Sequence, residues 1–212
     1  MKIFVAGATG RVAQALIQEL VSAGHHVFAG ARNPAAIPTT SNITPVAFDL
    51  TASPEELSKL IAPVDAIYFT AGSRGANLLQ VDAFGAVKLM QAAELAGVER
   101  FILLSSVFAT QPERWSDPGL AEIMNYNIAK FFADQWLIRN TSLDYTIIQP
   151  GRLVEASTAT GLIQTDVTFA QPNSIPNVAQ VLAAVLERRN TFGKVITMAD
   201  GSVPIAEALE AV

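Results

Sequence analysis

Three residue types in the middle of the chain could together transfer a proton. The segment YNIAK places Tyr126 and Lys130 four residues apart, and in a helix that spacing puts both side chains on one face. The segment LLSS ends an apolar run with Ser105 and Ser106. A nearby ammonium favours the phenolate form of a tyrosine, so the phenol can protonate a carbonyl oxygen that a serine hydroxyl steadies. The alternative is that Tyr126 packs at the edge of the core and Lys130 is a surface charge.

A second chemical signal lies in IFVAGATGRVAQALIQEL, residues 3–20, where an apolar run passes into a helical pattern through two glycines. In a nucleotide-binding turn, glycines allow a tight bend and let a diphosphate approach the amides at the start of a helix. Gly7 and Gly10 fit these two tasks, and Ala13 is small enough for the helix to lie close to the strand. We therefore predict dinucleotide binding, with an ordinary tight loop as the alternative.

The ends of the following strands indicate which dinucleotide is bound. Arg32 lies at the end of the second strand, where an NAD-preferring site carries an acid, and its guanidinium matches a 2′-phosphate. NADP(H) is therefore favoured over NAD(H), unless Arg32 is an ordinary solvated arginine. Asp49 could accept a hydrogen bond from the adenine amino group or could cap the next helix. The small residues of FTAGS, around Gly72, allow a second close approach of the coenzyme or form a simple turn.

The hydrophobic pattern of the chain predicts alternating strands and helices, and these elements position the residues named above. Short apolar runs predict strands at 2–7, 25–32, 43–50, 66–72, 100–106, 144–150 and 194–200, and 3.6-residue patterns predict helices at 11–23, 54–62, 77–96, 119–140 and 177–189. Continuous apolar runs indicate strands covered on both faces. The sequence therefore predicts an α/β fold of Rossmann type, a doubly wound, mainly parallel sheet with helices on both faces, in a single domain, 1–212.

Local signals mark some of the element boundaries. Ser53 and Glu56 stand at the spacing of a capping box, and Asn177 follows Pro176 at the start of a helical pattern. Residues 107–118 and 151–176 show no clear period. Loops of that length in a compact domain are usually functional, so we expect both on the substrate side.

Composition excludes several classes of protein. The net charge of −5 with 14 scattered Lys and Arg argues against nucleic-acid binding. The absence of cysteine excludes disulfides and thiolate sites. His25 and His26 have no carboxylate partner at metal-ligand spacing, so we predict no metal site. With no signal peptide and no apolar run of membrane-spanning length, we expect a soluble, cytoplasmic protein that binds no membrane.

Motifs across nearly the whole chain resemble the atypical, NAD(P)-binding branch of the short-chain dehydrogenase/reductase family, the group similar to NmrA-like proteins and flavin or biliverdin reductases. They are GATGRVA, ARNP, FDL, TAGS, VDAFGAVKLMQAAELAGVERFILLSS, YNIAK, DYTIIQPGRL and GSVPIAEAL. The resemblance implies NADP(H) bound by Gly7, Thr9, Gly10, Arg11, Val12, Arg32, Asp49, Leu50, Ala71, Gly72, Ser73, Lys130, Pro150, Gly151 and Leu153. Lys130 would reach the nicotinamide ribose, and the segment from Pro150 to Leu153 would line the nicotinamide. Related extended enzymes use the second serine of such a pair, which favours Ser106 over Ser105 beside Tyr126 and Lys130.

Two functions are compatible with these features. The first is an NADPH-dependent oxidoreductase acting on a small carbonyl, quinone or flavin-like acceptor, with Ser106, Tyr126 and Lys130 as catalytic residues. The second is a non-catalytic regulatory protein that senses NADP(H). A sugar-nucleotide epimerase is disfavoured, because the chain is too short to hold a sizeable C-terminal substrate domain. The small-molecule substrate is expected to be apolar or aromatic if the two long loops bring four large side chains over the nicotinamide: Phe108, Trp115, Met124 and Phe169.

Overall fold

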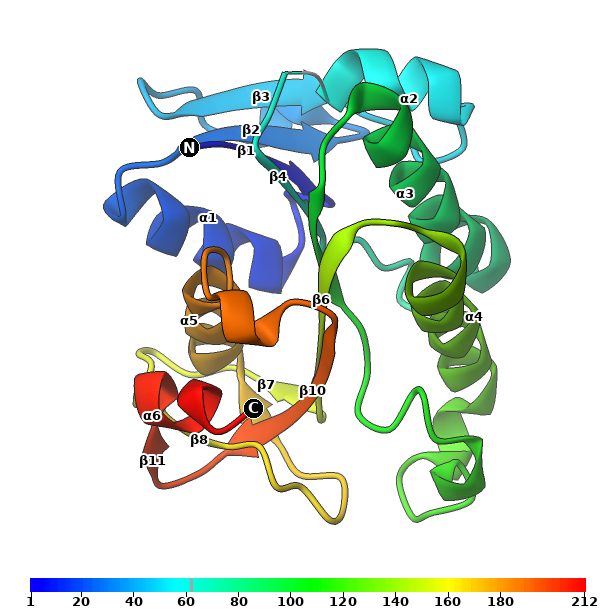
Figure 1. The fold of residues 1–212 in the computed structure, drawn as a ribbon, viewed down its shortest axis with the longest axis vertical. Helices are drawn as coiled ribbons and strands as arrows, with labels where there is room; N and C mark the ends of the chain where they lie inside the picture. Colours follow the sequence, from blue (N-terminus) through cyan, green and yellow to red (C-terminus); the bar gives the residue numbers. More distant parts are fainter. Residues whose placement is uncertain (62) are drawn as a thin grey trace.

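The computed structural model describes residues 1–61 and 63–212, and in it most of the strands form one central sheet against which the helices pack (Figure 1). In the described residues this sheet has nine strands, in the order β11-β8-β10-β6-β5-β4-β1-β2-β3. Their bounds are β1 Lys2–Ala6, β2 His26–Ala31, β3 Ile43–Ala47, β4 Ala66–Phe69, β5 Arg100–Leu104, β6 Asp144–Pro150, β8 Leu162–Gln164, β10 Lys194–Asp200 and β11 Val203–Pro204. Strands β1 to β6 and β10 pair in parallel, while β8 is antiparallel to both β10 and β11. The seven strands predicted from apolar runs are the parallel ones.

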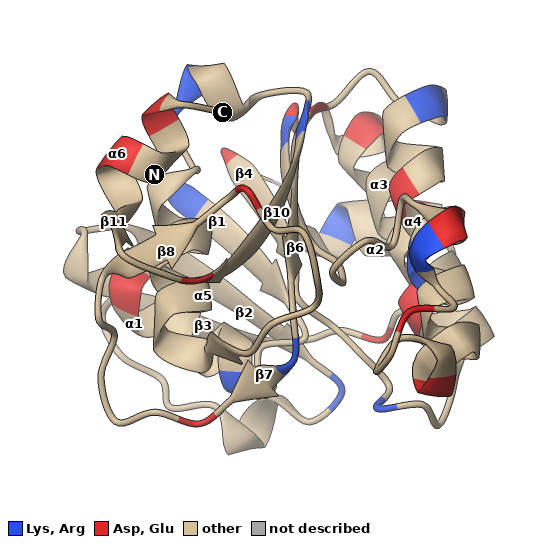
Figure 2. Cartoon of the chain, turned by 90° about the horizontal axis from the view of Figure 1, so that it is seen from below, with Lys and Arg blue, Asp and Glu red and all other residues tan. Residues whose placement is uncertain are grey.

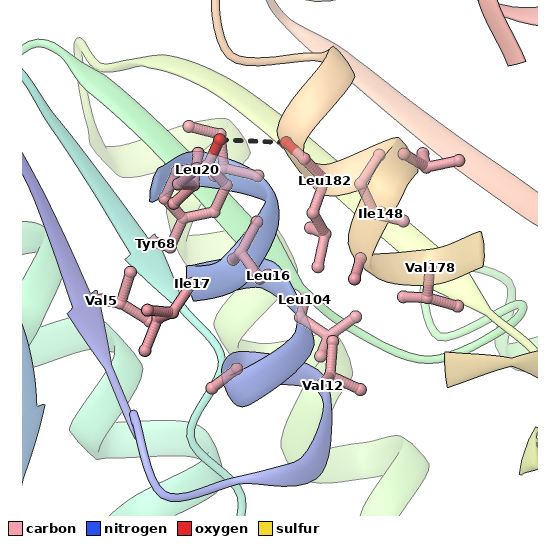
Figure 3. Packing of buried hydrophobic residues seen from close by; sticks show 14 of the residues in the cluster. Val5, Val12, Leu16, Ile17, Leu20, Tyr68, Leu104, Ile148, Val178 and Leu182 are labelled. Carbon is pink, nitrogen blue, oxygen red and sulfur yellow. Dashed lines mark hydrogen bonds between the residues drawn. The ribbon is translucent and has the colours of Figure 1, made fainter. Parts of the chain in front are cut away.

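Helices cover both faces of this sheet, which confirms the doubly wound architecture (Figure 1). On one face lie α1 (Arg11–Ser22), α5 (Ile175–Ala184) and α6 (Ile205–Glu210), and on the other lie α2 (Pro54–Ile61), α3 (Phe84–Ala96) and α4 (Met124–Asn140). Each face has its own core. Figure 3 shows the first core, in which Tyr68 of β4 packs beside Leu20 of α1 and donates its hydroxyl to the carbonyl oxygen of Leu182 in α5 at 3.0 Å.

A buried arginine links the start of strand β5 to the C-terminal end of helix α5. Arg100, at the start of β5, is 6% exposed and has no carboxylate within salt-bridge distance among the described residues. Its guanidinium donates to the carbonyl oxygens of Val185 and Leu186 at 2.6 and 2.9 Å, and to the Thr146 hydroxyl at 2.8 Å. Because the last carbonyls of a helix lack partners within it, these bonds satisfy the C-terminal end of α5.

Three helix boundaries differ from the predicted ones. The predicted helix 77–96 begins with a π-helical turn, Leu78–Ala83, before α3, and the predicted helix 119–140 becomes regular only at Met124. Helix α5 spans Ile175–Ala184 in place of 177–189, so Asn177 is not its cap. The Asn177 side chain instead accepts from the Thr160 amide and donates to Asp200, which ties a loop to the sheet. The predicted capping box is confirmed, because Ser53 and Glu56 exchange bonds of 3.0 and 3.3 Å.

The segment 151–176 contains more regular structure than its sequence indicates. It holds β7 (Leu153–Val154), β8 and β9 (Asn173–Ser174), and β7 pairs in parallel with β9 in a separate two-stranded sheet. Strands of two or three residues are too short to show a period of two, which is why the sequence did not reveal them. In the part of the chain that the structure describes, no helix combines the length and apolar character that crossing a membrane requires. A cytoplasmic location stays a prediction.

Candidate functional site

A cleft of about 950 Å³ opens where the parallel strands end, and it gathers most of the predicted site residues. Ser106, Tyr126 and Lys130 line it together with 12 of the 14 other residues predicted to bind the coenzyme. These 12 are Gly7, Thr9, Gly10, Arg11, Val12, Arg32, Ala71, Gly72, Ser73, Pro150, Gly151 and Leu153. The cleft therefore runs from the glycine turn after β1, past the ends of β2 and β4, to the ends of β5 and β6. Ligands of open α/β sheets bind in such a crevice.

The glycine turn has the tight bend and the free helix start that suit a diphosphate, and its first glycine is also required by a contact within the protein. Gly7 has φ of +85°, which permits the bend, but a Cβ on it would lie 2.5 Å from the Cα of Ala71. Its missing side chain thus lets two loops of the protein meet. Gly10 is the N-cap of α1, and among the described residues no side chain accepts a cap hydrogen bond from this helix. Such amides, with the positive end of the helix dipole, suit a phosphate group.

The end of the cleft that is predicted to hold the adenosine is basic. Arg32, which follows β2, is exposed and has no ion-pair partner in the described residues, and Arg74, in the loop after β4, also lines the cleft. Asp82 is fully buried and accepts from the Ser73 amide at 3.0 Å, which holds that loop in place. The free Arg32 guanidinium fits a 2′-phosphate.

Two residues predicted to bind the coenzyme, Asp49 and Leu50, are not among the described residues that line the cleft. Asp49 accepts from the Thr51 amide at 2.9 Å, which forms a turn. It does not cap the next helix, because the cap of α2 is Ser53. The bond from the Thr51 amide is the main cause that lowers the pKa of Asp49. Leu50 packs in the core on the side of α2 and α3. Their roles in coenzyme binding stay predictions.

The residues predicted to transfer a proton lie together at the opposite end. Tyr126 and Lys130 lie one turn apart on α4, and the Lys130 ammonium is 5.6 Å from the centroid of the Tyr126 ring. Lys130 is 2% exposed, and its Nζ donates to the carbonyl oxygen of Leu104 at 3.2 Å, which fixes the ammonium against the end of β5. The chain continues from that carbonyl through Ser105 to Ser106. Tyrosine, lysine and serine thus face one cleft.

The two serines have different surroundings. The Ser105 hydroxyl donates to Asp134 Oδ2 at 2.7 Å, and the same oxygen accepts from Gln149 Nε2 at 2.9 Å. The Ser106 hydroxyl has no side-chain partner within the described ranges, so it is free to contact a ligand in the cleft. Asp134 is fully buried, and this burial raises the pKa of its carboxyl to about 7, although the bonds from Ser105 and Gln149 and the charge of Lys130 oppose the shift.

The four large side chains that were expected to form an apolar pocket over the nicotinamide do not line the cleft as described. None of Phe108, Trp115, Met124 and Phe169 is among the described lining residues. Phe108 turns inward with φ of +55° and packs with Val107 and Leu120 in a small core of its own. The Trp115 indole donates to the Phe108 carbonyl oxygen at 3.1 Å. The 107–118 loop is therefore held by bonds within itself, by packing against Leu120 and by a bond from Arg114 to the Thr168 carbonyl oxygen.

Sequence reasoning missed several charged residues of the cleft. Arg74, Asp82 and Glu122 line it, and so does Arg152, for which no individual role was predicted. Arg74 has φ of +54°, an unusual backbone for a residue other than glycine. Arg152 directly follows the Pro-Gly pair that ends β6, so its position after a central parallel strand could have indicated it.

Comparisons with known proteins agree with this geometry. The family model described as NAD(P)H-binding matches residues 7–189. The crystal structure of the oxidoreductase ylbE from Lactococcus lactis is 46% identical, with a TM-score of 0.96 over 100% of this chain and 96% of that one. A putative NAD-dependent epimerase/dehydratase from Bacillus halodurans is 33% identical, with a TM-score of 0.86 over 100% of both chains. The uncharacterized sugar epimerase YhfK of Bacillus subtilis is 34% identical over 99% of each chain. The chain therefore belongs to the NAD(P)H-binding family, with the Rossmann fold of oxidoreductases like the short-chain dehydrogenases/reductases, as its motifs predict.

Proposed function

We propose that this protein is an NADPH-dependent reductase of a small carbonyl, quinone or flavin-like acceptor. The observation that carries the proposal is that Tyr126, Lys130 and Ser106 line the same cleft as the glycine turn and the Arg32 guanidinium. NADPH, when bound, supplies a hydride. The name of the Lactococcus relative, an oxidoreductase, supports the same class of reaction.

The chain's own residues supply the proton and orient the acceptor. The Tyr126 phenol donates its proton to the acceptor's carbonyl oxygen, and the Ser106 hydroxyl donates a hydrogen bond to the same oxygen. The Lys130 ammonium, held by the Leu104 carbonyl, stabilises the phenolate that remains. The amides at the start of α1 and the Arg11 side chain bind the diphosphate.

The first test compares Tyr126→Phe with wild type in NADPH oxidation against aldehydes, quinones and flavins. Loss of the phenol should lower aldehyde turnover about 100-fold or more. Flavin and quinone reduction can proceed without a protein acid, so it should change little. Tyr145→Phe is the matched control, since Tyr145 lies on β6 outside the cleft lining. Full aldehyde activity in Tyr126→Phe would remove the tyrosine from the mechanism.

Coenzyme choice has its own test. We expect Arg32→Ala to weaken NADPH binding about tenfold or more in a fluorescence titration and to leave NADH binding nearly unchanged, because only NADPH carries the 2′-phosphate. Arg189→Ala, an exposed arginine away from the cleft, is the control. An unchanged preference in Arg32→Ala would contradict the proposed NADPH dependence.

Two other functions make different predictions. A regulatory protein that senses NADP(H) would bind NADPH tightly and consume none with any acceptor. Two of the relatives carry epimerase in their names, and an epimerase would interconvert sugar-nucleotide isomers without net coenzyme oxidation. A chromatographic assay with sugar nucleotides, run beside the NADPH assay, separates these functions.

A further inference from the structure

The charges that line the cleft differ from those of the chain as a whole. The protein has a net charge of −5, yet five cationic side chains line the cleft against two carboxylates, Asp82 and Glu122. The cations are Arg11, Arg32, Arg74, Lys130 and Arg152. Figure 2 shows basic segments on the loops around β7. A cleft with this excess of one sign attracts anions.

Four of these cations already have a proposed role or an ion-pair partner. Arg32 and Arg74 follow β2 and β4 at the adenosine end, and Lys130 stands beside Tyr126. Arg11 begins α1 and forms an ion pair with Glu155 at 2.6 Å. Arg152 remains. Its side chain is exposed and has no hydrogen-bond or ion-pair partner within residues 1–61 and 63–212.

The backbone on either side of Arg152 is firmly held. A Cβ on Gly151 would collide with the Gln171 carbonyl oxygen, and the Gly151 amide donates to Asn173 Oδ1 at 2.7 Å. The carbonyl oxygen of Arg152 itself accepts from the Asn173 amide at 2.9 Å. The Arg152 main chain is thus fixed, which positions a guanidinium that has no partner among the described residues where it can meet a ligand in the cleft.

This fixed segment lies beside the proton-transfer residues. The Val107 amide donates to the Pro150 carbonyl oxygen at 2.8 Å, which places the end of β6 against the residue that follows Ser106. Much of the surrounding lining is apolar: Val107, Leu120, Ile123, Ala170 and Pro172. A ligand in this half therefore meets apolar side chains and one unpaired guanidinium, whose planar donors match a carboxylate.

We propose that Arg152 binds a carboxylate of the acceptor, so that the substrate is an anionic carbonyl or quinone compound with an apolar body. The inference rests on the proposed reductase function and adds its substrate class. Glu122 lies on the same cleft but forms no ion pair with Arg152. It therefore leaves the guanidinium available for the ligand.

The test measures binding without turnover. Calorimetry on the protein saturated with NADP⁺ compares 4-formylbenzoate with methyl 4-formylbenzoate, which share the aromatic aldehyde and differ in charge. Wild type should bind the carboxylate about 10- to 100-fold more tightly than the ester. Arg152→Gln, which removes the charge and keeps a polar side chain of similar shape, should abolish the preference, and Arg189→Gln should retain it.

Three results would overturn the inference. They are equal or undetectable binding of both compounds to wild type, a preference that persists in Arg152→Gln, and a loss of NADP⁺ affinity in Arg152→Gln as large as the loss for the carboxylate. The last result would assign Arg152 to the coenzyme. Failure of the proposed function is a separate outcome: NADPH is bound but never consumed, while the preference for the carboxylate persists.

Discussion

Replacing Asp134 by asparagine should stabilise the protein in a strongly pH-dependent way. The carboxyl is fully buried, and one of its oxygens accepts both the Ser105 hydroxyl and the Gln149 amide. An asparagine oxygen can accept the same two bonds. The substitution therefore removes a titratable buried group and keeps its hydrogen bonds and approximate shape.

The direction of the effect comes from the difference between the folded and unfolded states. Burial raises the pKa of Asp134 from 3.8 to about 7 in the folded protein. Below about pH 4 the carboxyl is protonated in both states. As pH rises from 4 to 7, the unfolded chain releases this proton while the folded protein retains it, so the free energy of unfolding falls. Above pH 7 the full destabilisation is present.

The magnitude is large for a single side chain. At about 1.4 kcal/mol per pKa unit, the shift corresponds to on the order of 4 kcal/mol as an upper limit. Part of this is already present at pH 5. The advantage of Asp134→Asn over wild type should therefore grow by about 2 to 3 kcal/mol between pH 5 and pH 8.

Urea unfolding at 25 °C, followed by tryptophan fluorescence at both pH values, measures this difference. Asp166→Asn is the control, because Asp166 is exposed and its replacement should change stability equally little at both pH values. A constant difference between Asp134→Asn and wild type, or a variant less stable than wild type at pH 8, would refute the reasoning that burial holds this carboxyl protonated.

Two further substitutions test other parts of the fold by thermal or urea unfolding. Gly7→Ala should destabilise by about 2 to 4 kcal/mol, because its Cβ would meet Ala71, while Gly24→Ala should lose only about 1 kcal/mol. Gly24 has a nearly equal φ of +84°, and a Cβ added there would meet nothing within 4 Å, so equal losses would contradict the proposed clash. Arg100→Met should destabilise by about 3 kcal/mol, because the Val185 and Leu186 carbonyls lose buried donors. A loss below about 0.5 kcal/mol would show that water replaces those bonds.

Local patterns were enough to predict the architecture and much of the cleft. The seven parallel strands appear as apolar runs because each is covered by helices on both faces. Ser53 and Glu56 interact within one helical turn, so their spacing alone predicted the capping box. Tyr126 and Lys130 share a helix face for the same reason, and the glycine turn follows a strand by simple adjacency. These relationships act over a few residues, where the chain itself sets the geometry.

The features of the site that the sequence did not predict depend on contacts between segments far apart in the chain. Both serines line the cleft, and which of them keeps a free hydroxyl depends on Asp134, 29 residues away in sequence from Ser105. The absent side chain of Gly7 is required by Ala71, on another strand's loop. Arg152 is held at the same cleft as Ser106 by the pairing of β7 and β9, strands too short to leave a periodic pattern. Such contacts form only when the sheet brings separate strand ends together, so local sequence periodicity does not encode them.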